Sequence, residues 1–171
     1  MGSKNVAIIL PTKDNPNQLD HCLRTLLDST SYENFRIIIV ESNTSNHPLN
    51  PMYNWQKAME HLYKNNPFKR IKIISTSSEG INIKAINIGI EDTQTEDILL
   101  IHDDMQFFKL YRRDWLRELA TKDLSKIGMV TYQGNFKKSG KEYLENLPWV
   151  GSWFCYIPRE TINEVSIYEE M

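Results

Sequence analysis

The chain has 171 residues, of which 40% are hydrophobic and 25% charged, so its composition is that of a globular domain and excludes a disordered chain. The formal net charge of -2 provides no positive field that would attract nucleic acid. The two cysteines, Cys22 and Cys155, are too few for a disulfide framework and indicate free thiols in a reducing compartment.

The first half of the chain alternates between predicted strands and helices. Val6–Leu10 is a continuous apolar run ended by Pro11, which is typical of a strand buried in a parallel sheet. Apolar residues then recur every three or four positions from Leu19 to Leu27, which predicts a helix with Asn15 or Asn17 as its cap. The same criteria predict, in order, a strand at Phe35–Val40, a helix at Met52–Tyr63, a strand at Arg70–Ser75, a helix at residues 82–92 and a strand at Asp97–Ile101.

The second half continues the pattern with shorter elements. We predict a helix at Asp114–Lys122, a short strand at Gly128–Tyr132, a turn at Gly134–Gly140 and a strand at Trp149–Ile157. Strands that alternate with helices pair in parallel through right-handed crossovers. The sequence therefore predicts one α/β domain, with a mostly parallel, Rossmann-like sheet flanked by helices.

No apolar run reaches the ~18 to 20 residues that a membrane-spanning helix needs, and the apolar stretch near the start is too short for a signal peptide. We therefore predict a cytoplasmic protein. The apolar stretch around Trp149 and Trp153 has two interpretations. We favour a core strand beside an acceptor pocket over a peripheral membrane contact, although Trp also favours membrane interfaces.

Polar residues follow each of the first four predicted strands. In sheets of this kind, ligands bind beyond the carboxyl ends of the strands, where the strand order reverses. The residues that belong at this edge are Thr12, Lys13 and Asp14, then Glu41 to Asn43, then Ser77 to Gly80, and finally His102 to Asp104. We expect these four segments to converge on one site.

Asp103 and Asp104 are the strongest candidates for a metal site. Mg²⁺ and Mn²⁺ prefer oxygen ligands and are commonly held by one or two carboxylates together with substrate phosphates. Adjacent residues of a strand point to opposite sides, so one carboxylate would face the ligand while the other supports the loop. His102 is a further candidate. The alternative is that the two acids are only polar residues of a turn.

Two other strand ends suit a nucleotide. Glu41 stands where many nucleotide-binding α/β proteins hold a ribose or base with an acidic side chain. The segment from Gly80 to Lys84 combines a turn with a helix start, which suits an anion or, alternatively, is an ordinary capped turn. No dinucleotide-binding GxGxxG or P-loop motif is present.

Together these segments resemble family 2 glycosyltransferases with a GT-A-type fold, over nearly the whole chain. The run from Val6 to Asp14 is similar to the family's first strand and turn, and Ile37 to Asn43 to its second strand, with Glu41 in place of the usual Asp. Gly80 followed by Lys84 to Ile90 resembles the helix before the metal strand. The segment around His102, Asp103 and Asp104 resembles the DxD motif, with His102 in place of its first Asp.

The resemblance implies a role for each matching residue. Residues 1–105 would form the nucleotide-sugar-binding half and residues 106–171 a short or truncated acceptor half. The donor would be bound by Pro11, Thr12, Lys13, Asp14, Glu41, Asn43, Gly80, Lys84 and Asp103, and Mn²⁺ or Mg²⁺ by Asp104 with Asp103. Ser152 and Trp153 would lie on the acceptor side, and Glu169 or Glu170 would be the catalytic base.

The function that follows is a metal-dependent, inverting glycosyltransferase that moves a sugar from a nucleoside diphosphate sugar to an acceptor hydroxyl of a glycan, a lipid-linked sugar or a protein. Such a reaction needs a carboxylate base and a metal that stabilises the departing diphosphate. The alternatives are a non-catalytic nucleotide-sugar-binding module, degenerate or truncated, and a nucleotidyltransferase.

Overall fold

The computed structural model describes residues 4–42, 54–55, 57, 70–76, 82–108, 114–122, 130–131 and 154–164. Within them, six strands form one sheet in the order β3-β2-β1-β4-β6-β5. The strands are β1 (Val6–Thr12), β2 (Phe35–Ser42), β3 (Ile71–Thr76), β4 (Asp97–Ile101), β5 (Val130–Thr131) and β6 (Phe154–Ile157). The helices are α1 (Pro16–Ser29), α3 (Asn82–Glu91), α4 (Trp115–Thr121) and α5 (Arg159–Glu164). Residues 54, 55 and 57 are also helical.

The sheet is mostly parallel, as predicted. Strands β3, β2, β1 and β4 pair in parallel, and only β6 runs against its neighbours β4 and β5. The chain adds β2 and β3 on one side of β1 and then returns to place β4 on the other side. The strand order therefore reverses between β1 and β4, which is where sheets of this type bind ligands.

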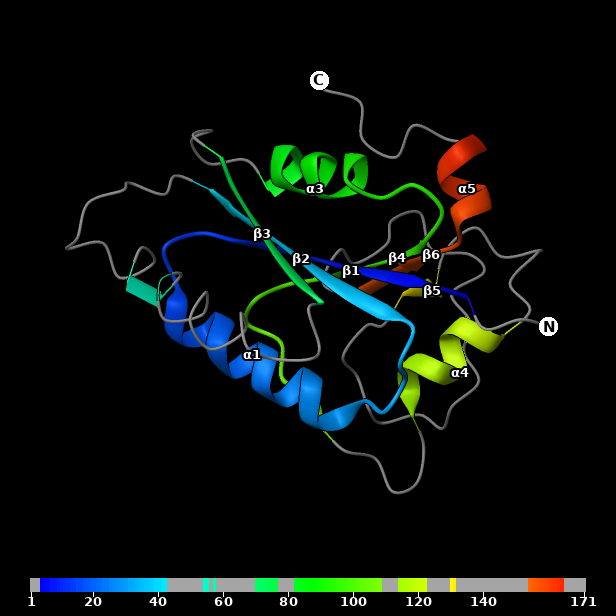
Figure 1. The fold of residues 1–171 in the computed structure, drawn as a ribbon, viewed down its shortest axis with the longest axis horizontal. Coiled ribbons are helices and arrows are strands. Elements are labelled where there is room, and N and C mark those ends of the chain that lie inside the picture. The colour runs from blue at the N-terminus through cyan, green and yellow to red at the C-terminus, as the bar shows by residue number, and fades with distance from the viewer. Residues whose placement is uncertain are drawn as a thin grey trace.

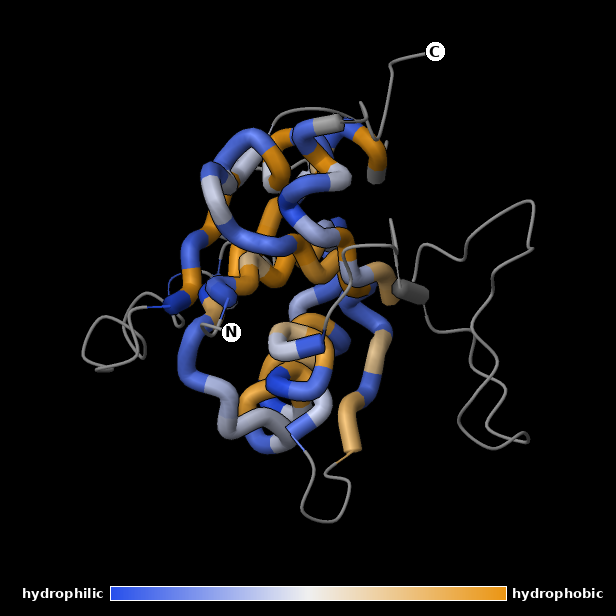
Figure 2. The backbone as a smooth tube through the Cα atoms, turned by 90° about the vertical axis from the view of Figure 1, so that its right-hand side faces the viewer, coloured by the Kyte–Doolittle hydropathy of each residue, from blue (hydrophilic) through white to orange (hydrophobic). Residues whose placement is uncertain are grey.

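The two faces of the sheet bury separate clusters of side chains. Helices α1 and α4 cover one face, and α3 and α5 cover the other (Figure 1). Alternate residues of β1 divide between the faces: Val6, Ile8 and Leu10 pack toward α1, whereas Ala7 and Ile9 pack toward α3. The strands are correspondingly hydrophobic and lie between helices with hydrophilic outer turns (Figure 2). These buried faces fix the register of each strand, because a slip of one residue would exchange the two sets.

Helix α1 begins at Pro16, whose fixed φ suits the first position of a helix. Asn15 occupies the cap position, but its side chain forms no cap hydrogen bond and instead contacts Gln18. Asn17, the other predicted cap, lies inside the helix. The buried residues Leu19, Cys22, Leu23 and Leu26 form the predicted apolar face.

Three sequence predictions differ from the structure. Strand β1 was expected to end at Pro11 but extends to Thr12, and β2 was expected to end at Val40 but extends to Ser42, so Glu41 lies within the strand. The ladder of β1 with β4 stops at Ile9, so Pro11 lies where β1 pairs with β2 alone. Helix α5 was not predicted. It is anchored by a tertiary contact, in which the main-chain N–H of Arg159 donates to buried Asp97 at 2.9 Å, and hydrophobic periodicity does not reveal such contacts.

The remaining sequence predictions are tested only in part. Most of the predicted helix at Met52–Tyr63, the turn at Gly134–Gly140 and the beginning of the last strand lie outside the described residues. Within the described part of the chain, no helix combines the length and the apolar character needed to cross a membrane. The division into halves at residue 105 stays a prediction.

Candidate active site

Three of the predicted site residues share one face at the carboxyl edge of the sheet. Leu10 of β1, Ile39 of β2 and Ile101 of β4 all belong to the core cluster under α1. Two positions further along β1 and β2 stand Thr12 and Glu41, whose side chains continue this face. Asp103 lies in the turn after β4 and reaches the same place, where it contacts Thr12. Thr12 and Glu41 are also direct register partners. The topology thus brings the ends of β1, β2 and β4 to one edge, as predicted for three of the four segments. The fourth segment, Ser77 to Gly80, lies outside the described residues.

The end of β4 is joined to the end of β1 by a side-chain hydrogen bond. The Thr12 hydroxyl donates to Asp103 Oδ2 at 2.6 Å. Burial raises the pKa of the Asp103 carboxyl above its ordinary value; the Thr12 hydrogen bond opposes this shift, and the negative charge of Asp104 adds to it. Asp104 itself is exposed. Two adjacent carboxylates that repel each other favour a cation between or beside them.

Helix α1 holds the loop that carries these acids. The Cys22 thiol donates to the carbonyl of His102 at 3.6 Å, and the N–H of Phe107 donates to the Thr25 hydroxyl at 3.2 Å. Burial, followed by the charges of Asp103 and Asp104, raises the pKa of the Cys22 thiol to about 12. Cys22 is therefore protonated at neutral pH and acts as a hydrogen-bond donor, not as a nucleophile.

Glu41 is the most unusual side chain of the site. It is fully buried, and among the described residues no donor forms a hydrogen bond with either carboxylate oxygen. Burial, followed by the negative charge of Asp14, raises the pKa of Glu41 to about 7. A main-chain contact from Asp14, weaker than a hydrogen bond, opposes the shift. Asp14 has a left-handed backbone with φ 51° in the turn after β1. A buried carboxylate without a partner costs free energy unless a ligand supplies hydrogen-bond donors.

The other predicted residues are less informative. Pro11 is part of β1, Lys13 and Asp14 are exposed in the turn after it, and Lys84 is exposed in the first turn of α3. Outside the described residues lie Asn43, Gly80, Ser152, Trp153, Glu169 and Glu170. Their roles stay predictions.

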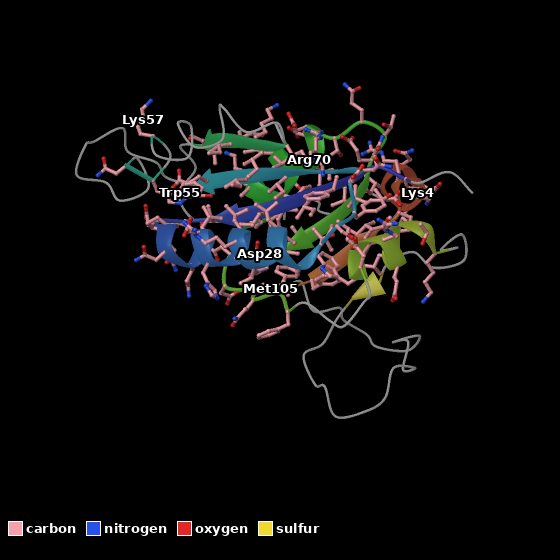
Figure 3. The ribbon with its side chains drawn as sticks, turned by 60° about the horizontal axis from the view of Figure 1, so that its bottom comes forward. Lys4, Asp28, Trp55, Lys57, Arg70 and Met105 are labelled. Carbon is pink, nitrogen blue, oxygen red and sulfur yellow. The ribbon has the colours of Figure 1, made fainter. Side chains whose placement is uncertain are left out.

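Sequence reasoning missed three residues near this edge. Cys22 and Thr25 support the acid loop, and the signal was their position on the face of α1 that packs on the sheet. Trp55 packs against the α1-side core, and its indole N–H is buried without a partner among the described residues. Figure 3 shows Trp55 at the carboxyl edge of the sheet and Lys4 at the opposite edge.

The sequence matches the family model described as glycosyl transferase family 2 over residues 7–160. The chain belongs to glycosyl transferase family 2. No curated protein matches the sequence.

The fold of this family 2 chain is similar to that of solved GT-A glycosyltransferases. The mannosyltransferase PcManGT from Pyrobaculum calidifontis, in complex with GDP-Man and Mn²⁺, shares 12% identity at a TM-score of 0.67, covering 96% of this chain and 47% of that one. S. aureus TarS 1-349 shares 14% identity at a TM-score of 0.61, covering 97% of this chain and 50% of that one. At these identities the likeness shows the fold alone. The chain spans about half the length of these structures.

The acids of this family 2 chain fit a hard divalent cation. Within the described residues, no group of three or more His, Cys, Asp or Glu side chains surrounds a common point. Asp103 and Asp104 therefore offer two carboxylates at most, and donor phosphates and water would have to complete the shell. This division of ligands is what Mg²⁺ and Mn²⁺ commonly adopt with phosphate substrates.

Two hollows in the described surface are lined by other residues than these acids. A hollow of about 340 Å³ at the amino edge of the sheet includes Lys4, Asp97 and Arg159. A second, of about 410 Å³, is lined by Thr25, Asp28, Ser29 and Phe107. Neither contains Thr12, Glu41 or Asp103, so the candidate site is defined by its polar groups and the strand order.

Proposed function

We propose that this chain binds a nucleoside diphosphate sugar at the carboxyl edge of β1, β2 and β4 and transfers its sugar to an acceptor hydroxyl, with inversion and with help from Mn²⁺ or Mg²⁺. The observation that carries the proposal is the buried carboxylate of Glu41, which has no hydrogen-bond partner among the described residues and lies at the same edge as Asp103 and Asp104. Family membership supports glycosyl transfer as the reaction.

The geometry suits the parts of such a donor. Glu41 would accept hydrogen bonds from the nucleoside, whose N–H or O–H groups supply the donors that the described residues lack. Strands in a sheet are about 4.8 Å apart, so Glu41 on β2 and Asp103 beyond β4 are separated by two strand spacings, about 10 Å. A nucleoside and its diphosphate extend over a comparable distance. Asp103 and Asp104 would therefore face the diphosphate.

A divalent cation held by Asp103 and Asp104 would neutralise the negative charge that develops on the departing diphosphate. The solved mannosyltransferase in complex with GDP-Man and Mn²⁺ shows that a protein of this fold binds such a cation, which supports a divalent ion here. Thr12 contacts the Asp103 carboxylate, and α1 contacts the main chain of the loop that carries both acids. For the acceptor we keep Ser152 and Trp153, and for the base Glu169 or Glu170, as predictions. A cytoplasmic location with at most peripheral membrane contact also stays a prediction.

The test is ligand-dependent thermal stability of the wild type. UDP, GDP, dTDP, CDP and ADP are added one at a time, with and without Mn²⁺. A ligand at a hundredfold excess over its Kd stabilises by about 2.7 kcal/mol, which corresponds to roughly 5 to 10 °C in a domain of this size. We expect such a shift with at least one nucleotide, and only when Mn²⁺ is present.

The assignment to the acids is tested with two variants. Asp104→Asn should abolish the shift, whereas Asp28→Asn, a matched change on the exposed side of α1, should retain it. Nucleotide binding that does not depend on Mn²⁺ or on Asp104 would favour a binding module without a metal. If no nucleotide stabilises the wild type, the proposed donor site is wrong.

A further inference from the structure

The Thr12 hydroxyl continues the pairing of β1 and β4 after their ladder has stopped. The last paired residues are Ile9 and Leu100, which are 91 positions apart in sequence. Thr12 and Asp103 are also 91 positions apart. They therefore keep the register of the ladder, and a side-chain hydrogen bond of 2.6 Å takes the place of the main-chain pairing that ends before Pro11.

This bond has the burial and geometry of a structural constraint. Thr12 is only 4% exposed, and its β-branched side chain is restricted at χ1. Asp103 is half-buried, so its bond to Thr12 is partly shielded from competing water. A hydrogen bond from a hydroxyl to a carboxylate is among the stronger types in proteins.

Helix α1 contacts the main chain of the loop after β4, which carries Asp103. Cys22 contacts the carbonyl of His102, Thr25 contacts the N–H of Phe107, and the N–H of Met105 closes a turn onto His102 at 3.3 Å. These contacts hold the loop on both sides of Asp103, and the Thr12 hydrogen bond restricts the Asp103 side chain itself.

We propose that Thr12 is a positioning residue, whose hydroxyl orients the Asp103 carboxylate to receive a divalent cation together with the donor diphosphate. This inference rests on the proposed function, since it presumes that Asp103 faces the cation and diphosphate. It assigns the Thr12 hydroxyl to Asp103, whereas the family resemblance assigned Thr12 to binding of the donor. Residues that hold a metal ligand in place commonly contribute 10- to 100-fold to metal affinity.

The test measures Mn²⁺ binding by electron paramagnetic resonance, with Mn²⁺ alone and with UDP or GDP, together with thermal unfolding of each variant. Thr12→Val removes the hydroxyl and keeps the shape, and we expect it to weaken Mn²⁺ binding about tenfold. Thr12→Ser restores the hydroxyl and should restore the affinity. The matched control is Thr93→Val, because Thr93 is also 4% exposed and its hydroxyl bonds at 2.7 and 2.9 Å lie at the other end of the sheet.

A double-mutant comparison separates positioning from a general loss of structure. In an Asp103→Ala background, Thr12→Val should have no further effect on Mn²⁺ affinity, because its partner is gone. Should Thr12→Val fail to fold, Thr12→Ala is measured with the same expectation. Unchanged Mn²⁺ affinity in the valine variant, failure of serine to restore it, or an equal loss in the Asp103→Ala background would overturn the inference while the proposed function stands. If the wild type binds neither Mn²⁺ nor nucleotide, the proposed function fails, and the inference fails with it.

Discussion

Replacing Glu41 with glutamine should remove a specific pH dependence from the stability of this protein. Glu41 is fully buried, its oxygens have no hydrogen-bond partner among the described residues, and its pKa is about 7. The shift arises first from burial and then from the charge of Asp14. Glutamine has nearly the same shape but does not titrate, so the variant isolates the ionisation of this one group.

The sign and size follow from the pKa. In the unfolded chain, Glu41 has an ordinary pKa near 4.5, so between this value and about 7 the folded protein retains a proton that the unfolded chain has lost. The free energy of unfolding therefore falls as pH rises through this window. A shift of this size corresponds to about 3 kcal/mol. Below pH 4.5, Glu41 is protonated in both the folded and the unfolded protein, so ionisation of Glu41 does not lower the free energy of unfolding.

The assay is urea unfolding of the wild type and Glu41→Gln between about pH 4.5 and pH 8. The free energy of unfolding of the variant minus that of the wild type should rise by about 3 kcal/mol across this range. Any constant cost of the buried amide cancels in this difference. A difference that stays constant with pH would refute the reasoning.

Glu96→Gln serves as the matched control. Burial raises the pKa of Glu96, but the hydrogen bond and charge of Arg36 and the Gln94 main chain outweigh this effect and hold it below its ordinary value. The pairing is close, with Arg36 Nε 2.7 Å from Glu96 Oε1. The stability it contributes is therefore lost only as pH falls below the usual range of a glutamate. Across the window used for Glu41, the difference between Glu96→Gln and the wild type should stay constant.

Two packing predictions can be tested by the same unfolding experiment. A Cβ added at Gly89 of α3 would lie 2.5 Å from Ile9 Cγ2, so Gly89→Ala should destabilise by about 1 to 3 kcal/mol, and Ile9→Ala should partly relieve this cost. Equal stability of Gly89→Ala and wild type would contradict the close packing of α3 on β1. Asp114 caps α4 through Arg117 N and also accepts hydrogen bonds from Thr30 and Ser31 at 2.8 to 2.9 Å. Asp114→Ala should therefore cost about 1 to 3 kcal/mol, and Asp114→Asn, which keeps one acceptor oxygen, should cost less. An alanine variant as stable as wild type would show that these bonds contribute nothing.

The parallel core was predictable from the sequence because a strand that is buried on both faces of the sheet is an uninterrupted run of apolar residues. Strands β1 and β2 contain uninterrupted apolar runs, and the intervening helix α1 has apolar residues spaced three and four apart. This alternation leaves few possible topologies. It also places Thr12, Glu41 and Asp103 at one edge, since strands that run in parallel end on the same side.

The pairings within that edge were not predictable, because they depend on register. The bond between Thr12 and Asp103 exists because β1 and β4 keep an offset of 91 residues. A slip of one residue would turn Thr12 to the other face of the sheet. The role of Cys22 depends likewise on how α1 is rotated against the loop after β4. The strand register and the rotation of the helix follow from the packing of the whole core, and they leave no local pattern in the sequence.

Two buried carboxylates at opposite ends of the strands differ in their hydrogen bonding. At the amino edge, Asp97 is 3% exposed and receives hydrogen bonds from Tyr156 at 2.7 Å and from the Arg159 N–H at 2.9 Å, with Lys4 at 3.3 Å. At the carboxyl edge, Glu41 is fully buried without a partner among the described residues. The described part of the chain thus satisfies one buried carboxylate in three ways and provides no hydrogen-bond partner for the other. An unpaired buried carboxylate persists at the cost of stability, and such costs concentrate at functional sites. The contrast within one sheet therefore supports the ligand site that we propose at the ends of β1, β2 and β4.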